Sequence, residues 1–209
     1  VLTGTGDKAF CTGGDIAEMQ TYNDVTGKEF ANLCIELAKL IFQLPVPLIA
    51  EINGFCLGGG HEINLMCDLS IASDKAVIGQ TGLKVGLLPV WGSAQILPRL
   101  IGEKKARENI FLAKRMKAKE ALERGVINKV VPHKDLEKET LKWCEQILET
   151  GPQALKYTKR CLNREWERLL PVFEEGASLL AEIFQSPECQ EGVTAFLEKR
   201  KPDFMKFRK

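Results

Sequence analysis

The chain has no excess of charge of either sign: its 209 residues include 29 basic and 28 acidic side chains, which nearly cancel. This balance gives no argument for nucleic acid or an anionic membrane surface as a partner. No apolar run approaches the roughly eighteen residues of a membrane span, and no signal peptide is recognisable. We expect a cytoplasmic protein. Because the chain begins at Val1 without a methionine, we also expect a preceding portion, and a mitochondrial location stays open.

Metal ligands are equally scarce. There are two histidines, His61 and His133, and no C-x-x-C pair, so we expect no metal site. His61-Glu62 begins like a zinc-protease motif, but Leu65 occupies the second ligand position, and we expect His61 at a helix surface or an interface. G-x-S-x-G and Walker A motifs are absent. The seven cysteines are scattered and odd in number, which is typical of reduced thiols.

The chain does contain two glycine-rich turns. Gly58-Gly59-Gly60 leads into His61-Glu62 and a mostly apolar run. Three glycines are costly at a helix start, unless their backbone N–H groups must approach a negative charge closely. Glu62 would then be a carboxylate beside backbone donors, an arrangement suited to carbonyl chemistry. A tight strand-to-helix turn, with Glu62 facing the helix dipole, is the alternative.

The first glycine-rich turn contains Gly4-Thr5-Gly6, which matches the start of a dinucleotide-binding pattern, but residues 10–14 do not continue as a helix. Gly14 directly precedes Asp15, a candidate helix cap, so its N–H is expected to be free. Together with an N–H from Gly59 or Gly60 it would form an oxyanion hole. Each such donor is worth about 3 kcal/mol to an enolate-like transition state.

Hydrophobic periodicity predicts an α/β core over residues 1–133 and a helical region over 134–209. The core should begin with a short buried strand at 1–3 and repeat the order strand, glycine turn, helix at 1–19 and 48–66. Proline and glycine signals divide the rest. Expected strands are 48–52, 69–73, 77–79 and 126–131, and expected helices are 16–19, 28–44, 58–67, 93–100, 104–113, 118–124, 135–149, 152–168, 171–185 and 187–199.

These segments resemble the crotonase (enoyl-CoA hydratase/isomerase) superfamily. The resemblance covers essentially the whole chain and rests on the motifs at 9–16, 52–62, 67–69 and 196–202. It implies an α/β spiral of ββα units with a C-terminal helical trimerisation region, assembled as a homotrimer or a dimer of trimers, and lacking the first part of the spiral. It also implies that Gly14 and Gly59 hold a thioester carbonyl, while Glu62 activates water.

One catalytic position departs from the hydratase pattern. The second glutamate of the hydratases follows Gly-Gln-Pro, whereas Gly79-Gln80-Thr81 is followed here by Gly82. The 79–86 segment and His61 look like the naphthoyl-CoA synthase and ketocyclohexane-carboxyl-CoA hydrolase branch. That branch carries an acid after its Val-Gly, where residues 87–91 of this chain contain none. It also carries a catalytic tyrosine, whose position is Phe184 here. These differences favour a hydratase-like enzyme.

We therefore expect an acyl-CoA lyase of the enoyl-CoA hydratase type, acting in fatty acid metabolism, with no cofactor beyond the coenzyme A of its substrate. A C–C bond-forming or bond-cleaving enzyme on a cyclic β-keto acyl-CoA and a non-catalytic CoA-binding homologue are the alternatives. The basic run 199–209 is either a solvated tail or a contact for a phosphorylated ligand. Beside the catalytic Glu62, Gly14 and Gly59, the candidate substrate-binding residues are Asp15, Ile16, Gly60, Gly82, Leu88, Pro89, Trp91, Phe184 and Lys199.

Overall fold

Two four-stranded β-sheets share the strands of the chain. The computed structural model describes residues 1–208 and, within that range, every side chain except that of Glu167. One sheet has the order β1-β3-β5-β8 and the other the order β2-β4-β6-β7. All neighbouring strands are parallel except the β6–β7 pair. The strands are β1 (Leu2–Thr3), β2 (Ala9–Cys11), β3 (Ile49–Ile52), β4 (Phe55–Leu57), β5 (Leu69–Ser73), β6 (Val77–Gly79), β7 (Met116–Lys117) and β8 (Lys129–Val131).

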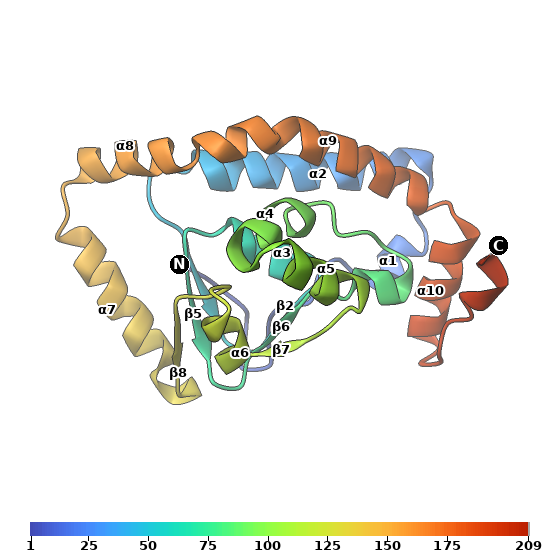
Figure 1. Ribbon diagram of the computed structural model, residues 1–209, viewed down its shortest axis with the longest axis horizontal. Coiled ribbons are helices and arrows are strands. Elements are labelled where there is room, and N and C mark those ends of the chain that lie inside the picture. Colours follow the sequence, from blue (N-terminus) through green and yellow to red (C-terminus); the bar gives the residue numbers. More distant parts are fainter. Residues whose placement is uncertain (209) are drawn as a thin grey trace.

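Each of the first three turns of the chain gives one strand to each sheet and then forms a helix, and in the last turn α6 lies between β7 and β8. The predicted spiral of ββα units is confirmed. Figure 1 shows α2 and α9 packed along each other above the sheets, with α7 at one end of the molecule and α10 at the other. The helices are α1 (Ile16–Met19), α2 (Asp24–Gln43), α3 (Gly59–Met66), α4 (Ser93–Ile101), α5 (Glu103–Phe111), α6 (Ala118–Glu123), α7 (Leu136–Leu148), α8 (Pro152–Leu162), α9 (Arg164–Ile183) and α10 (Pro187–Leu197). Short 3₁₀ turns are η1 (Gly82–Val85), η2 (His133–Asp135) and η3 (Met205–Phe207).

The two helices that flank the site begin at clear sequence signals. The Asp15 carboxylate accepts hydrogen bonds from the N–H groups of Ala17 and Glu18, which caps α1. Asn23 and Thr26 form a reciprocal capping box at the start of α2. This box starts α2 four residues earlier than the predicted position 28, while its end just before Pro45 agrees with the prediction.

The structure differs from the predicted elements at four places. The first strand is exposed rather than buried, because β1 is the edge of its sheet. Residues 9–11 and 55–57, expected as loop or turn, form β2 and β4. The predicted helix break at Pro171 is wrong: α9 passes through Pro171, and the break falls at Asn163, whose amide donates to the Phe42 carbonyl oxygen.

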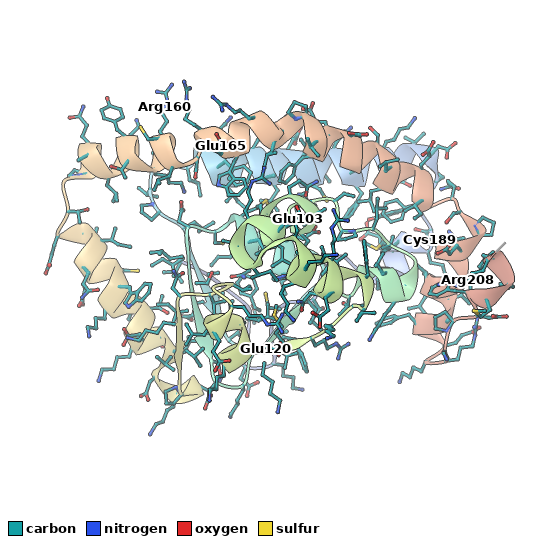
Figure 2. All side chains as sticks on the ribbon, in the orientation of Figure 1. Glu103, Glu120, Arg160, Glu165, Cys189 and Arg208 are labelled. Atoms are coloured by element: carbon teal, nitrogen blue, oxygen red, sulfur yellow. The ribbon has the colours of Figure 1, made fainter. Side chains whose placement is uncertain are left out.

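The two glycine-rich turns come together in the structure. A Cβ built on Gly13 would lie 3.3 Å from the Gly59 nitrogen, so the turn after β2 touches the start of α3. Charged side chains such as Arg160 of α8 and Glu165 of α9 are exposed (Figure 2). No helix within the described residues is long and apolar enough to cross a membrane.

Candidate active site

A cavity of about 880 Å³ opens where the two glycine turns meet α1, η1 and α10. Its wall contains both a buried carboxylate and an apolar surface, and its rim carries basic side chains. Eight of the predicted site residues line it: Gly14, Asp15, Ile16, Gly59, Glu62, Gly82, Leu88 and Trp91. The lining also includes residues of α10 and reaches Pro202, so sequence segments more than a hundred residues apart build one site.

Two glycines that line this cavity have backbone N–H groups without an acceptor in the described part of the chain. Gly14 lies between β2 and α1, and its N–H donates to no group among residues 1–208. Gly59 is the first residue of α3, where an N–H has no intrahelical acceptor. Both residues line the same cavity. Gly58, with φ of 55°, supplies the left-handed backbone that starts α3 without a side-chain cap.

Glu62 is the buried carboxylate of the cavity wall. It is 5% exposed, and its Oε1 accepts hydrogen bonds from the backbone N–H of Trp91 at 2.9 Å and of Ser93 at 3.2 Å. Burial raises the pKa of Glu62 to about 7, against the lowering effect of these donors. A carboxylate with a pKa near neutrality can both accept and return a proton at physiological pH.

Gly82, at the position where the hydratase pattern has its second glutamate, has little room for a side chain. A Cβ there would lie 3.0 Å from the Leu87 carbonyl oxygen, and the Gly82 N–H donates to Gln80 Oε1 at 3.4 Å. Gln80 is 2% exposed and donates through Nε2 to the Ser93 hydroxyl at 3.0 Å. Apart from Glu62, the cavity wall in the described part of the chain holds one further carboxylate, Asp15, which is exposed and serves as the α1 cap.

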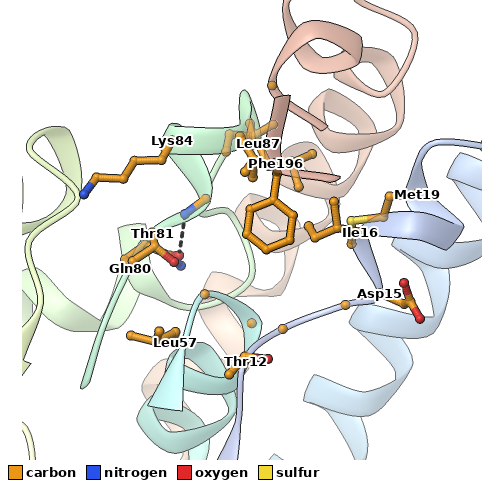
Figure 3. Close-up of a pocket in the computed structure, with 18 of the residues that line it drawn as sticks. Thr12, Asp15, Ile16, Met19, Leu57, Gln80, Thr81, Lys84, Leu87 and Phe196 are labelled. Carbon is orange, nitrogen blue, oxygen red and sulfur yellow. Dashed lines mark hydrogen bonds between the residues drawn. The ribbon is translucent and has the colours of Figure 1, made fainter. Parts of the chain in front are cut away.

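The rim of the cavity is basic. Lys84, Arg115 and Arg200 contribute to its lining, and all three are exposed. Figure 3 shows the Phe196 ring of α10 between Ile16 of α1 and the Gln80-Thr81 segment, with the Asp15 carboxylate pointing away from that ring. A ligand with an apolar end and a negatively charged end fits this distribution.

Four predicted substrate-binding residues do not line the cavity. Gly60 packs on the backbone of Cys11, Pro89 is buried beside the lining, and Phe184 is 0% exposed in a ring cluster with Tyr22 and Phe30. Lys199 takes a left-handed conformation with φ of 57° after α10, and Arg200 and Pro202 line the cavity instead. Lys209, which ends the predicted basic run, lies outside the described residues.

The prediction for His61 is wrong. Its ring is 0% exposed rather than on a surface, and neither ring nitrogen has a hydrogen-bond partner among the described residues. Burial lowers the pKa of His61 to about 4, so the ring is neutral at physiological pH. The physical reason is the packing of α3, which contacts both α2 and α4. A polar side chain in this helix can therefore be buried, and its polarity alone does not place it on the protein surface.

The sequence analysis missed several residues that line the cavity or hold Glu62. Ser93 and Gln80 hold the surroundings of Glu62, yet a serine at a helix start and a glutamine after a strand are common structural choices. Cys34, on the buried face of α2, and Arg115, next to β7, also line the cavity. The only available signal was the family motif that ends in Gly79-Gln80, which marks the segment but assigns no role to it.

The fold and site together define a protein of the crotonase superfamily. The profile of the enoyl-CoA hydratase/isomerase family matches residues 1–207. An enoyl-CoA hydratase from Mycobacterium avium subsp. paratuberculosis K-10 is 28% identical with a TM-score of 0.86, and the match covers 97% of this chain and 78% of that one. One from Bacillus anthracis is 35% identical with a TM-score of 0.75, covering 97% and 79%. One from Bacillus halodurans is 25% identical with a TM-score of 0.85, covering 92% and 79%.

The chain therefore belongs to the enoyl-CoA hydratase/isomerase family. This agrees with the family resemblance carried by the glycine-turn motifs.

Proposed function

We propose that the protein is an acyl-CoA lyase of the enoyl-CoA hydratase type, which adds water to an α,β-unsaturated thioester. The observation that carries this proposal is Glu62, a buried carboxylate with a pKa of about 7, in one cavity with the free N–H groups of Gly14 and Gly59. The solved relatives are named as enoyl-CoA hydratases, which agrees with this activity. The basic rim would face the phosphates of coenzyme A.

The reaction divides into two proton transfers. Glu62 takes a proton from water as the water oxygen bonds to Cβ of the thioester, and the double-bond electrons move to form an enolate. The N–H groups of Gly14 and Gly59 hold the negative thioester oxygen, and each is worth about 3 kcal/mol by comparison with other oxyanion donors. Glu62 then returns its proton to Cα. One carboxylate performs both transfers, because Gly82 offers no second acid.

Replacing the carboxylate tests this role. The Glu62→Gln variant keeps an oxygen for the Trp91 and Ser93 donors but removes the base, so hydration of short and cyclic enoyl-CoA thioesters should fall about 10³-fold. Glu137→Gln is a matched control, because Glu137 is exposed on α7 and does not line the cavity. Unchanged turnover in the Glu62→Gln variant would remove Glu62 from the mechanism.

A second candidate is C–C bond formation or cleavage on a cyclic β-keto acyl-CoA. Gly82 favours it, since the second hydratase carboxylate is missing from the described cavity wall. Phe184 argues against this activity, because it occupies the position of the catalytic tyrosine and is buried outside the cavity. Direct assays of ring opening and ring closure separate the two activities. Absence of turnover on every substrate of both panels, despite acyl-CoA binding, would favour a non-catalytic binding protein.

Assembly is a separate proposal. We propose that the helices of residues 134–209 join copies of the chain into a homotrimer or a dimer of trimers, as the family resemblance implies. Measuring the mass of the purified protein by light scattering tests this, and a monomer would contradict it.

A further inference from the structure

Trp91 joins three parts of the site. Its backbone N–H donates to Glu62 Oε1 at 2.9 Å, and its indole N–H donates to the carbonyl oxygen of Cys34 on α2. Its ring also packs on the start of α3, since a Cβ built on Gly59 would lie 3.3 Å from Trp91 Cζ3. The indole is therefore fixed at one edge by α2 and at the other by the glycine that offers a backbone donor.

The wall around this indole is apolar. Cys34 is 6% exposed, and burial together with the neighbouring Glu62 charge raises the pKa of its thiol to about 12, so the thiol stays neutral. Elsewhere the same cavity is lined by apolar side chains of a second hydrophobic cluster, Met19, Phe30, Leu88, Val90 and Leu180. Basic side chains occur in the lining at exposed positions, at Lys84, Arg115 and Arg200.

This arrangement fixes how a thioester must lie. Its carbonyl oxygen is held at Gly14 and Gly59, and its charged part lies at the basic rim. The acyl group must then enter the buried side of the cavity, where the indole stands against Gly59. An aromatic wall held by a hydrogen bond to a helix cannot turn aside as readily as a free side chain.

We propose that Trp91 sets the length of the acyl group that the protein accepts, with short acyl chains ending against its indole. This inference rests on the proposed binding of an acyl-CoA thioester and names the class of acyl group: short rather than long. The residue acts by direct contact with the end of the acyl chain. Its hydrogen bond to the Cys34 carbonyl keeps the wall in place.

Binding of saturated acyl-CoA thioesters tests the inference without depending on turnover. Butyryl-, octanoyl- and dodecanoyl-CoA are titrated calorimetrically into the wild-type protein and the Trp91→Ala variant. The wild-type protein should bind butyryl-CoA best. In Trp91→Ala each newly accommodated methylene should tighten binding roughly 4-fold, because burying a CH₂ group has about that effect.

Two further variants sharpen the comparison. Trp91→Leu keeps an apolar but smaller side chain, so it should show the same shift with smaller amplitude, and it serves if the alanine variant does not fold. Trp143→Leu is the matched control, because Trp143 lies on α7, donates a hydrogen bond to Glu139 and does not line the cavity. Its chain-length profile should equal that of the wild-type protein.

The outcomes separate the inference from the proposed function. If wild-type protein and folded Trp91 variants bind all three thioesters with the same length profile, the inference is overturned and acyl-CoA binding stands. If the wild-type protein binds none of the thioesters, both the inference and the proposed function are overturned. A shift toward octanoyl- or dodecanoyl-CoA in the Trp91 variants, and not in Trp143→Leu, supports the inference.

Discussion

At the scale of single residues, the neighbours Gly59 and Gly60 are glycines for different reasons. A Cβ on Gly59 would meet the Trp91 ring at 3.3 Å, a contact that a small shift relieves. A Cβ on Gly60 would lie 2.0 Å from the Cys11 carbonyl oxygen, which belongs to β2 and cannot move without breaking the β2–β4 pairing. Gly59 therefore serves the cavity, and Gly60 serves the contact between helix and strand.

Alanine at each position should separate these roles. Gly60→Ala should lower the free energy of unfolding by about 3 kcal/mol or more, as overpacking against backbone does. Gly59→Ala should change stability by less than about 1 kcal/mol, since alanine also favours the helix. It keeps the backbone N–H, but its methyl group would crowd the thioester beside Trp91, so acyl-CoA turnover should fall at least about 10-fold. Urea unfolding and steady-state assays measure both. Equal stability losses would contradict this division.

The buried Glu62 should also leave a signature in stability. Its pKa is raised to about 7 in the folded protein, so folding favours its protonated form, and stability falls as pH rises from about 4.5 through 7. The free energy of unfolding of Glu62→Gln relative to wild type should therefore increase by about 3 kcal/mol between pH 4.5 and pH 8. Urea titrations at both pH values measure this, with Glu137→Gln as the control. A difference independent of pH would mean that Glu62 is ionised in the folded state.

Activity should depend on the same ionisation of Glu62, but it should rise with pH, whereas stability falls. If Glu62 acts as the base, kcat/KM for enoyl-CoA hydration rises with pH through about 7 and then levels off, because the carboxylate form becomes fully populated. A pH–rate profile checks this midpoint. A rate that falls as pH rises through 7 would assign a different protonation state to the active form.

Site residues were predictable only where a backbone role or a motif marked them. Gly14, Gly59 and Glu62 could be predicted because backbone donors beside a carboxylate suit carbonyl chemistry, and the structure brings all three into one cavity. His61 shares the motif but is buried without a partner, because burial depends on what covers α3. Phe184 is matched by family position alone, and its ring packs with Tyr22 and Phe30 instead of lining the cavity.

At the scale of elements, predictability followed length and local signals. The helices 93–101 and 103–111 have strong periodicity and clear ends, and the prediction placed them within about two residues. Strands β2, β4 and β7 have two or three residues each, too few for an alternating pattern. Pro171 was expected to break a helix, yet α9 continues through it and packs along α2, showing that tertiary packing outweighs the local penalty of proline.

The element most directly tied to the cavity rim is α10 with the segment that follows it. Glu191 on α10 accepts two hydrogen bonds from the Arg200 guanidinium, at 2.7 and 3.3 Å, and others from the Asp203 N–H and Lys206. The Arg200 guanidinium holds the pKa of Glu191 down at about 2, so the carboxylate is charged under ordinary conditions. One carboxylate thus folds the segment 200–206 back onto α10.

Removing that charge should loosen the rim. In Glu191→Gln, trypsin should cleave after Lys199 and Arg200 several-fold faster. KM for acyl-CoA should rise several-fold with kcat nearly unchanged, since Arg200 and Pro202 line the cavity, whereas the donors to Glu62 belong to residues 91 and 93. Glu188→Gln on the same helix is the control, because Glu188 is exposed and does not line the cavity. A drop in kcat with constant KM would place the effect at the chemistry instead.

At the scale of the whole molecule, few polar side-chain contacts join the arm formed by α8 and α9 to the α/β core. α8 is largely exposed, but its Lys159 is 5% exposed and donates to Asp68 Oδ2 at 2.6 Å and to the Val46 carbonyl oxygen at 2.9 Å. The same Asp68 oxygen accepts the Leu48 N–H at 2.7 Å. Lys159 thus fixes α8 beside the entry to β3, and with it the start of α9, which covers α2 and the apolar wall of the cavity.

Breaking this ion pair should destabilise the whole fold rather than the arm alone. Lys159→Met leaves Asp68 and a carbonyl oxygen without their cation, and we expect a loss of about 3 kcal/mol in the free energy of unfolding. Asp68→Asn in the same background removes the uncompensated charge, so the double variant should recover part of the loss, a coupling that a double-mutant cycle in urea measures. If the arm were an independent unit, Lys159→Met would melt α8 in a separate transition seen by far-UV circular dichroism, while acyl-CoA binding stayed constant. A single transition shifted to lower urea, with binding lost in the same range, is what we expect of an arm that holds the cavity wall in place.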